Sequence, residues 1–136
     1  MVLIDTSVII GFLKGEESNK AKIMNEILSR DIPFGISCYT YQEVLQGARN
    51  EEEFQTLKKY LSSQQIYYLD SEAETYEKAA RLYYSLRRGG ITPRSTLDML
   101  IALTAMENKL ALLHNDHDFD VMAEKIPELR ILHSGF

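Results

Sequence analysis

The chain has 136 residues, of which 45% are hydrophobic and 26% charged, and its formal net charge is −5. This length and composition predict a single folded domain over residues 1–136, and the acidic balance excludes a protein that coats nucleic acid through bulk positive charge. One cysteine, no basic leader and no apolar run near the roughly 18–20 residues of a membrane span predict a cytoplasmic protein. We expect no internal disulfide, no cysteine-rich metal site and no membrane partner.

Short apolar runs alternate with longer helical patterns along the chain. In chain order we expect a strand over 2–4, helices over 8–13 and 18–30, a strand over 34–36, helices over 39–49 and 51–62, a strand over 66–69, helices over 71–88 and about 95–108, a strand over 110–113 and a last strand at 131–132. Strands separated by helices predict a central parallel sheet covered on both faces, which is a three-layer α/β/α sandwich.

Two of the expected helices carry informative patterns. The helix over 71–88 places Ala73, Tyr76, Ala80 and Tyr83 on one face and ends at the two glycines that follow it. The helix that begins near Leu97 is apolar nearly all round, which predicts that it is buried.

Acidic residues follow two of the expected strands. Asp5 comes directly after the first strand, and Asp116 and Asp118 come just after the apolar run that ends at Leu113. Functional groups of a doubly wound sheet gather beyond the carboxyl ends of its strands. We therefore expect these carboxylates to share one site.

Two further acids interrupt apolar helical stretches. Glu43 lies in the helix over 39–49, and Asp98 lies near the start of the helix expected to be buried. A buried carboxylate is costly unless a partner compensates it, and only Arg94 offers a cation within four positions of Asp98.

Each acid also has a purely structural interpretation. Asp5 can cap a helix, Asp98 can belong to a capping box, Glu43 can be a solvated helix residue, and Asp116 and Asp118 can form a turn. One shared cause, a bound divalent cation, explains all the positions together.

Crowded carboxylates repel one another, and a hard cation with oxygen ligands removes that repulsion. Mg²⁺ or Mn²⁺ suits an oxygen-only set, whereas zinc is disfavoured because His114 and His117 lie in a strand-to-turn segment without a cysteine. Such a site favours hydrolysis of phosphodiesters. Ser7 and Asn115 are expected to support it by hydrogen bonding to the carboxylates.

Four segments in this order resemble the PIN domain, and in particular the VapC-type toxin ribonucleases. They are Asp5-Thr6-Ser7-Val8, Glu43-Val44-Leu45-Gln46-Gly47-Ala48, Leu97-Asp98-Met99-Leu100-Ile101-Ala102 with Thr104-Ala105, and Asn115-Asp116-His117-Asp118-Phe119. Together they span essentially the whole chain.

The resemblance implies a Mg²⁺- or Mn²⁺-dependent endoribonuclease on the PIN-type sandwich. It implies that Asp5, Glu43 and Asp98 are core catalytic acids, with Asp116 favoured as the fourth and Asp118 supporting it or capping the next helix. Asp5, Asp98 and Asp116 are the expected metal ligands. The resemblance also implies transfer or ribosomal RNA as substrate, a cognate VapB-like antitoxin that blocks the acidic cleft, and a homodimer.

An RNA substrate requires local positive charge on this acidic chain. Residues 81–97 contain four arginines and no acid, and we expect Arg87, Arg88 and Arg94 to contact RNA phosphates. The alternative for Arg87 and Arg88 is that they only complement the end of their helix. Two other functions stay open at this point, namely a PIN nuclease of RNA processing or repair outside a toxin pair, and a non-catalytic metal- or RNA-binding module.

Overall fold

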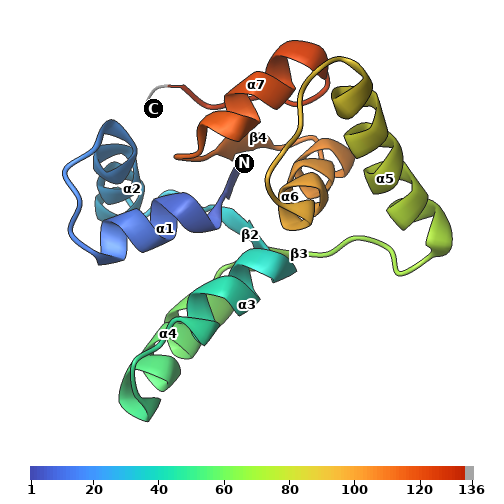
Figure 1. Cartoon of the computed structure of the whole chain (residues 1–136). Coiled ribbons are helices and arrows are strands. Elements are labelled where there is room, and N and C mark those ends of the chain that lie inside the picture. Colours follow the sequence, from blue (N-terminus) through green and yellow to red (C-terminus); the bar gives the residue numbers. More distant parts are fainter. Residues whose placement is uncertain (134–136) are drawn as a thin grey trace.

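The computed structural model describes residues 1–133 and alternates short strands with longer helices (Figure 1). The strands are β1 (Val2–Ile4), β2 (Gly35–Ser37), β3 (Gln65–Tyr67) and β4 (Ala111–Leu113). The helices are α1 (Thr6–Leu13), α2 (Asn19–Ser29), α3 (Cys38–Gln46), α4 (Glu51–Ser62), α5 (Ala73–Arg88), α6 (Thr96–Glu107) and α7 (His117–Lys125).

The strands form one parallel sheet in the order β3-β2-β1-β4. The chain therefore builds outward from β1 through β2 to β3 and then crosses back to add β4 on the other side of β1. The strand order reverses at the β1–β4 pair, and in open α/β sheets a crevice forms outside the carboxyl ends of strands at such a point. This topology predicts the site beyond the ends of β1 and β4.

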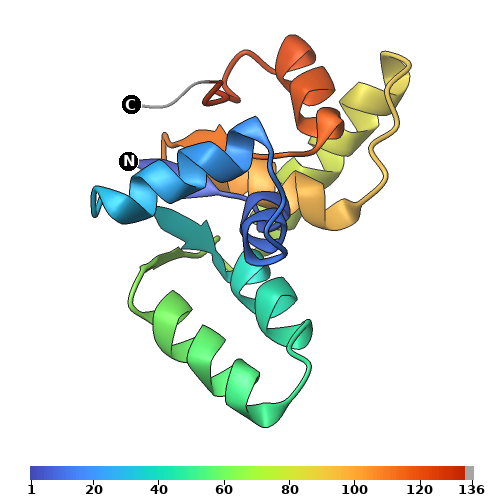
Figure 2. The same cartoon turned by 90° about the vertical axis from the view of Figure 1, so that its left-hand side faces the viewer.

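Hydrophobic residues on the two faces of the sheet form two separate cores. Along β1, Leu3 contributes to one core, whereas Val2 and Ile4 contribute to the other, as the alternation of side chains along a strand requires. The first core takes its helical residues from α5, α6 and α7, and the second takes them mainly from α1 and α2 (Figures 1 and 2). The expected three-layer sandwich with a central parallel sheet is confirmed.

Helices α3 and α4 pack on each other and project from the body of the molecule (Figures 1 and 2). The bounds of α4 match the prediction. The helix begins after Asn50, whose side chain caps it by accepting a hydrogen bond from the backbone N–H of Glu53 at 2.8 Å. Among the described residues, no helix combines the length and apolar composition that crossing a bilayer requires.

The structure differs from the predicted elements in several places, and helix α3 ends at Gln46 rather than at residue 49. Helix α1 begins at Thr6 rather than residue 8, because Asp5 caps it immediately after β1. The expected last strand is only an isolated bridge between Ile131 and Leu112. Helix α7 had no predicted bounds, although a helix was expected to follow residue 118.

The face of α5 that carries Ala73, Tyr76, Ala80 and Tyr83 is not the face that packs into the core. Ala79 and Leu86 are its buried residues, whereas Tyr76 is 49% exposed. A tyrosine can keep its hydroxyl end in water while small and aliphatic side chains make the packed contact. The predicted end of this helix is confirmed, because Gly90 follows with a φ of 86° that favours glycine.

Candidate active site

Asp5 links the end of β1 to the end of β4. Its backbone N–H donates to the carbonyl of Leu113 at 2.9 Å. Its carboxylate caps α1 by accepting a hydrogen bond from the backbone N–H of Ser7 at 3.1 Å. The Ser7 hydroxyl donates to the same carboxylate oxygen at 2.6 Å and accepts from the backbone N–H of Asn115 at 2.9 Å. One serine therefore holds the two strand ends together through hydrogen bonds.

The Asp5 side chain is buried, and burial raises the pKa of its carboxyl group. Hydrogen bonds from Ser7 and Thr6 oppose this shift, and the nearby charge of Glu43 adds to it. Capping and a functional role are compatible here, because a cap engages one carboxylate oxygen and leaves the other available.

Glu43 reaches the same region from α3. The Thr6 hydroxyl donates to Glu43 Oε1 at 2.8 Å and lies 3.1 Å from the hydroxyl oxygen of Thr40. The hydroxyl of Ser37, at the end of β2, lies 3.3 Å from that of Thr40. Because each hydroxyl has one hydrogen, donation from Ser37 to Thr40, then to Thr6 and then to Glu43 satisfies the whole row. Glu43 is thus oriented by the segments that follow β1 and β2.

Three carboxylates gather on the other side of the site. Asp98, Asp116 and Asp118 each offer an oxygen, and these oxygens lie within 4.8 Å of one another. Asp116 caps α7 by accepting from the backbone N–H of Asp118 at 3.0 Å, so the expectation that Asp118 could be the cap is wrong. Asp118 instead lies in the first turn of α7, with its carboxylate beside the other two.

Asp98 lies in the first turn of α6 and is not the partner in a capping box. Ser95 caps that helix by accepting from the backbone N–H of Leu97 at 3.2 Å. Within residues 1–133, no hydrogen bond reaches the Asp98 carboxylate. The purely structural interpretation therefore does not account for an acid at this position.

The pKa of Asp98 is raised from 3.8 to about 7. Partial burial is the largest cause, and the remaining contributions come from the charges of Asp5, Asp116, Asp118 and Glu43. The four acids predicted to be catalytic and the supporting Asp118 therefore lie within electrostatic reach of one another, although they come from four separate segments of the chain.

Arg94 provides a positive charge at the edge of this group. Its Nε donates to Asp118 Oδ2 at 3.1 Å, and its Nη2 donates to Asp116 Oδ1 at 3.3 Å. The sequence analysis expected Arg94 to contact an RNA phosphate, and the structure places it on two acidic side chains of the protein itself.

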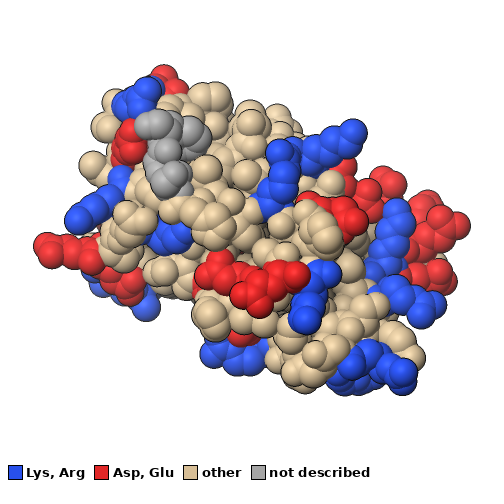
Figure 3. Space-filling model, turned by 90° about the horizontal axis from the view of Figure 1, so that it is seen from above, with Lys and Arg blue, Asp and Glu red and all other residues tan. Residues whose placement is uncertain are grey.

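Arg87 and Arg88 lie exposed in the last turn of α5. Their guanidinium carbons lie 5.9 Å from the ring centres of Tyr83 and Tyr84, respectively, which is within the range of a cation–π contact. Both the predicted contact with RNA and the helix-end role are compatible with this position. On the face seen in Figure 3, acidic and basic side chains are interspersed, so any attraction of nucleic acid there is local.

Buried His114 fixes the backbone next to Asp116 and was missed as a supporting residue. Its Nδ1 accepts from the backbone N–H of Asp116 at 3.0 Å, so its Nε2 carries the hydrogen and donates to Asp120 Oδ1 at 3.0 Å. Burial is the main cause of its lowered pKa. Both ring nitrogens are engaged, which agrees with the expectation that zinc is disfavoured.

Two threonines that orient Glu43 were also missed from the sequence. Thr6 directly follows Asp5, and Thr40 precedes Glu43 by three positions on the same helix, so adjacency to a predicted acid was the available signal. Asn115, an expected supporting residue, contacts the site through its backbone N–H, which donates to the hydroxyl of Ser7.

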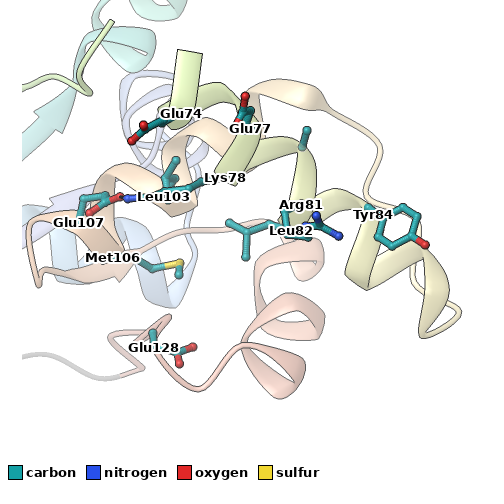
Figure 4. Close-up of a pocket in the computed structure, with 11 residues that line it drawn as sticks. Glu74, Glu77, Lys78, Arg81, Leu82, Tyr84, Leu103, Met106, Glu107 and Glu128 are labelled. Carbon is teal, nitrogen blue, oxygen red and sulfur yellow. Dashed lines mark hydrogen bonds and ion pairs between the residues drawn. The ribbon is translucent and has the colours of Figure 1, made fainter. Parts of the chain in front are cut away.

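A groove of about 910 Å³ lies elsewhere, between α5 and α6 (Figure 4). Lys78 of α5 and Glu107 of α6 form an ion pair at 3.0 Å beside it. None of the candidate acids lines this groove. The groove is therefore separate from the acidic site.

The donor set of the acidic site fits a hard divalent cation. All its side-chain ligands are carboxylate oxygens, the ligand type that Mg²⁺ and Mn²⁺ prefer. Burial is the main cause of the raised pKa of Asp98, and the negative charges of the neighbouring acids add to it; a cation would offset this second cause.

Comparisons with known proteins agree with this fold and site. The PIN domain family model matches residues 2–125. VapC ribonuclease Mb1587 of Mycobacterium bovis and ribonuclease VapC11 of Mycobacterium tuberculosis are each 32% identical to this chain over 124 residues, covering 90% of it and 92% of the relative.

Solved structures extend the similarity to the whole fold. A toxin–antitoxin complex from Klebsiella pneumoniae contains a chain with a TM-score of 0.71 and 20% identity, with 100% of both chains covered. A DNA-bound VapBC structure from Salmonella typhimurium gives a TM-score of 0.68 at 25% identity, covering 97% of this chain and 98% of that one. The chain therefore belongs to the PIN domain family and, within it, to the VapC ribonucleases.

Proposed function

We propose that this chain is a Mg²⁺- or Mn²⁺-dependent endoribonuclease that acts as the toxin of a toxin–antitoxin pair. The proposal depends on the clustering of four other carboxylates around Asp98. Burial and the charges of these carboxylates raise its pKa to about 7. Independent strand ends and helix starts supply those acids, so a chance surface cluster is a poor explanation. The names of the curated relatives support ribonuclease activity.

In this proposal Asp5, Asp98 and Asp116 hold the cation, with Asp118 beside them. When bound, it supplies Lewis-acid assistance for hydrolysis of a phosphodiester. The protein contributes orientation. Ser7 holds one oxygen of Asp5, and Thr6 holds Oε1 of Glu43, which leaves Glu43 Oε2 available to orient a water or accept its proton.

The proposed substrate is a specific transfer or ribosomal RNA, as the family resemblance implies. A chain with a net charge of −5 needs local cations to bring phosphates to its acidic site. Arg87 and Arg88 are exposed and form no ion pair among the described residues, so they are the proposed phosphate contacts, with Arg94 at the site itself.

The proposed protein partners are a VapB-like antitoxin and a second copy of the chain. Solved structural neighbours include VapBC complexes from several bacteria. Clustered carboxylates attract a basic side chain of an inhibitor, and blockage of the acidic site by such a side chain is the mode of inhibition that we propose. Residues 1–136 are proposed to form a single PIN domain, in line with the match over 2–125.

Expression of the wild type and of an Asp5→Ala variant in bacteria tests this function. The wild type should arrest growth and generate new RNA 5′ ends at a small number of sites, and co-expression of the neighbouring antitoxin reading frame should restore growth. The Asp5→Ala variant, expressed at the same level, should neither arrest growth nor generate new RNA 5′ ends. Arrest by both proteins, or arrest without new RNA ends, would contradict the proposal.

A further inference from the structure

Arg94 occupies the carboxylates that the proposed cation needs. Two of the three acids whose oxygens lie within 4.8 Å of one another, Asp116 and Asp118, are already paired with its guanidinium group. The contacts use Nε and Nη2, two donors on one edge of the guanidinium plane, to reach two different side chains. Arg94 thus bridges the acids as a single positive charge.

We infer that Arg94 is a tethered counter-cation that closes the Asp116–Asp118 side of the acidic site when no metal is bound, and that a divalent cation must displace it to bind. This inference rests on the proposed metal-dependent function. It assigns Arg94 a positioning and regulatory role in metal binding that is distinct from contact with RNA.

The backbone around Arg94 is held in place, while its side chain is exposed and contacts the acids only through its guanidinium group. Ile91 donates to the carbonyl of Leu86 at 2.8 Å, Pro93 is buried, and Ser95 caps α6. The side chain of Arg94 is 76% exposed. Displacement therefore requires rotation of one long side chain into solvent and no rearrangement of the fold.

Charge balance gives the reason for displacement. Without a metal, the guanidinium is the only basic group paired with Asp98, Asp116 or Asp118 among residues 1–133. A divalent ion on these oxygens neutralises more charge than the arginine, and it repels a guanidinium that remains beside it. The two cations therefore compete, and the arginine weakens the apparent affinity for metal.

Titration of the metal-free protein with Mn²⁺, followed by electron paramagnetic resonance, measures this competition without any need for activity. Arg94→Gln should bind Mn²⁺ roughly 3- to 10-fold more tightly than the wild type, because two exposed ion pairs no longer oppose binding. Arg94→Lys should lie between the two. Arg49→Gln, which removes the same charge from an ion pair with Glu53 on α4, should match the wild type.

A second measurement follows Arg94 itself. The Nε–H signal of Arg94 in a ¹H–¹⁵N spectrum, assigned by its loss in Arg94→Gln, should move toward the position of a free arginine as Mg²⁺ is added. The corresponding signal of Arg49 should stay unchanged. Thermal unfolding of each variant without metal verifies that it folds.

The outcomes separate the inference from the proposed function. Mn²⁺ binding by the wild type with equal or weaker binding by Arg94→Gln, or an Arg94 signal unmoved at saturating Mg²⁺, overturns the inference and leaves the metal site standing. Failure of both the wild type and Arg94→Gln to bind Mn²⁺ any better than Asp98→Asn overturns the metal site, and the inference with it.

Discussion

The two sides of the acidic site are built in opposite ways. Asp5 and Glu43 are held by hydroxyl groups, since Ser7 donates to the first and Thr6 to the second. Asp98, Asp116 and Asp118 receive no side-chain hydroxyl among the described residues, and a single exposed arginine balances the last two. We call these groups the hydroxyl-held pair and the repelling triad.

The hydroxyl-held pair illustrates how carboxylates are oriented, and the triad illustrates how carboxylates gain affinity for a cation. Hydroxyl donors fix the direction of a carboxylate at little cost, because they stabilise the charged form in place. Repulsion between Asp98 and the neighbouring acids instead favours the binding of a cation, at the expense of the stability of the metal-free protein. The hydroxyl-held pair is therefore oriented by its own hydrogen bonds, whereas the triad is the group to which we propose that a cation binds.

Removal of a charge from the triad should have the largest effect on activity. Asp98→Asn should lower the rate of RNA cleavage by on the order of 10³-fold, because it removes a group that organises charge in the transition state. The rate should be measured on a defined RNA with excess Mg²⁺. Asp70→Asn, which changes an exposed acid outside the site, is the matched control and should leave the rate unchanged. Comparable rates for Asp98→Asn and the control would remove Asp98 from the mechanism.

Loss of the key hydroxyl should destabilise the preformed side. Ser7→Ala should reduce the free energy of unfolding by about 2–3 kcal/mol, because it removes a hydrogen bond to buried Asp5 and leaves the N–H of Asn115 without its acceptor. Urea unfolding measures the change. Ser29→Ala removes an exposed hydroxyl from α2 and should change stability far less. Equal effects of the two substitutions would show that the Ser7 hydroxyl contributes no more to the free energy of unfolding than an exposed hydroxyl does.

Neutralisation of Asp98 should stabilise the metal-free protein, whereas loss of the Ser7 hydroxyl should destabilise it. Its folded-state pKa of about 7 lies above the ordinary 3.8, so the unfolded chain releases this proton first, and wild-type stability falls as the pH rises from about 4 to about 7. The shift corresponds to roughly 4 kcal/mol at most, which solvent screening of a half-buried group reduces to about 2 kcal/mol.

The measurement is urea unfolding of wild type and Asp98→Asn in a metal chelator at pH 4 and pH 8. The variant should gain about 2 kcal/mol over the wild type at pH 8 and little at pH 4. Saturating Mg²⁺ should reverse the order at pH 8, since only the wild type gains fully from binding. A variant that is less stable than the wild type at pH 8 without metal would contradict the repulsion on which the triad is defined.

Charge reversal at the end of α5 should have the smallest effect. Arg88→Glu, measured in an Asp5→Ala background that leaves RNA uncut, should weaken RNA affinity by roughly 3- to 10-fold and reduce the salt dependence by about one unit of slope. Arg30→Glu, at the residue that directly follows α2 and pairs with Glu26, is the control. An unchanged affinity and slope would leave Arg88 with only its role at the end of α5.

Periodicity and local capping explain why much of the fold could be predicted from sequence. The all-apolar pattern of α6 predicted burial, and residues 101–105 of that helix are indeed buried. The buried face of an amphipathic helix is harder to predict, as α5 shows. Aliphatic and aromatic residues both lie along this helix, and only tertiary packing determines which of them are buried. Helix α7 had no predicted bounds, since its polar first turn resembles a continuing loop.

The sequence by itself determined which side chains are chemically suited to the site, because carboxylates at strand ends and in apolar helices have few explanations other than a shared cation. Only the tertiary structure decided which of these side chains belong to the hydroxyl-held pair and which belong to the repelling triad. The reversal of strand order at β1 brings Asp5 and Asn115 together, the return of α3 places Glu43 on Thr6, and the loop before α6 places Arg94 on the triad. These contacts span 22 to 108 positions along the chain, so local propensity and spacing carry no information about them.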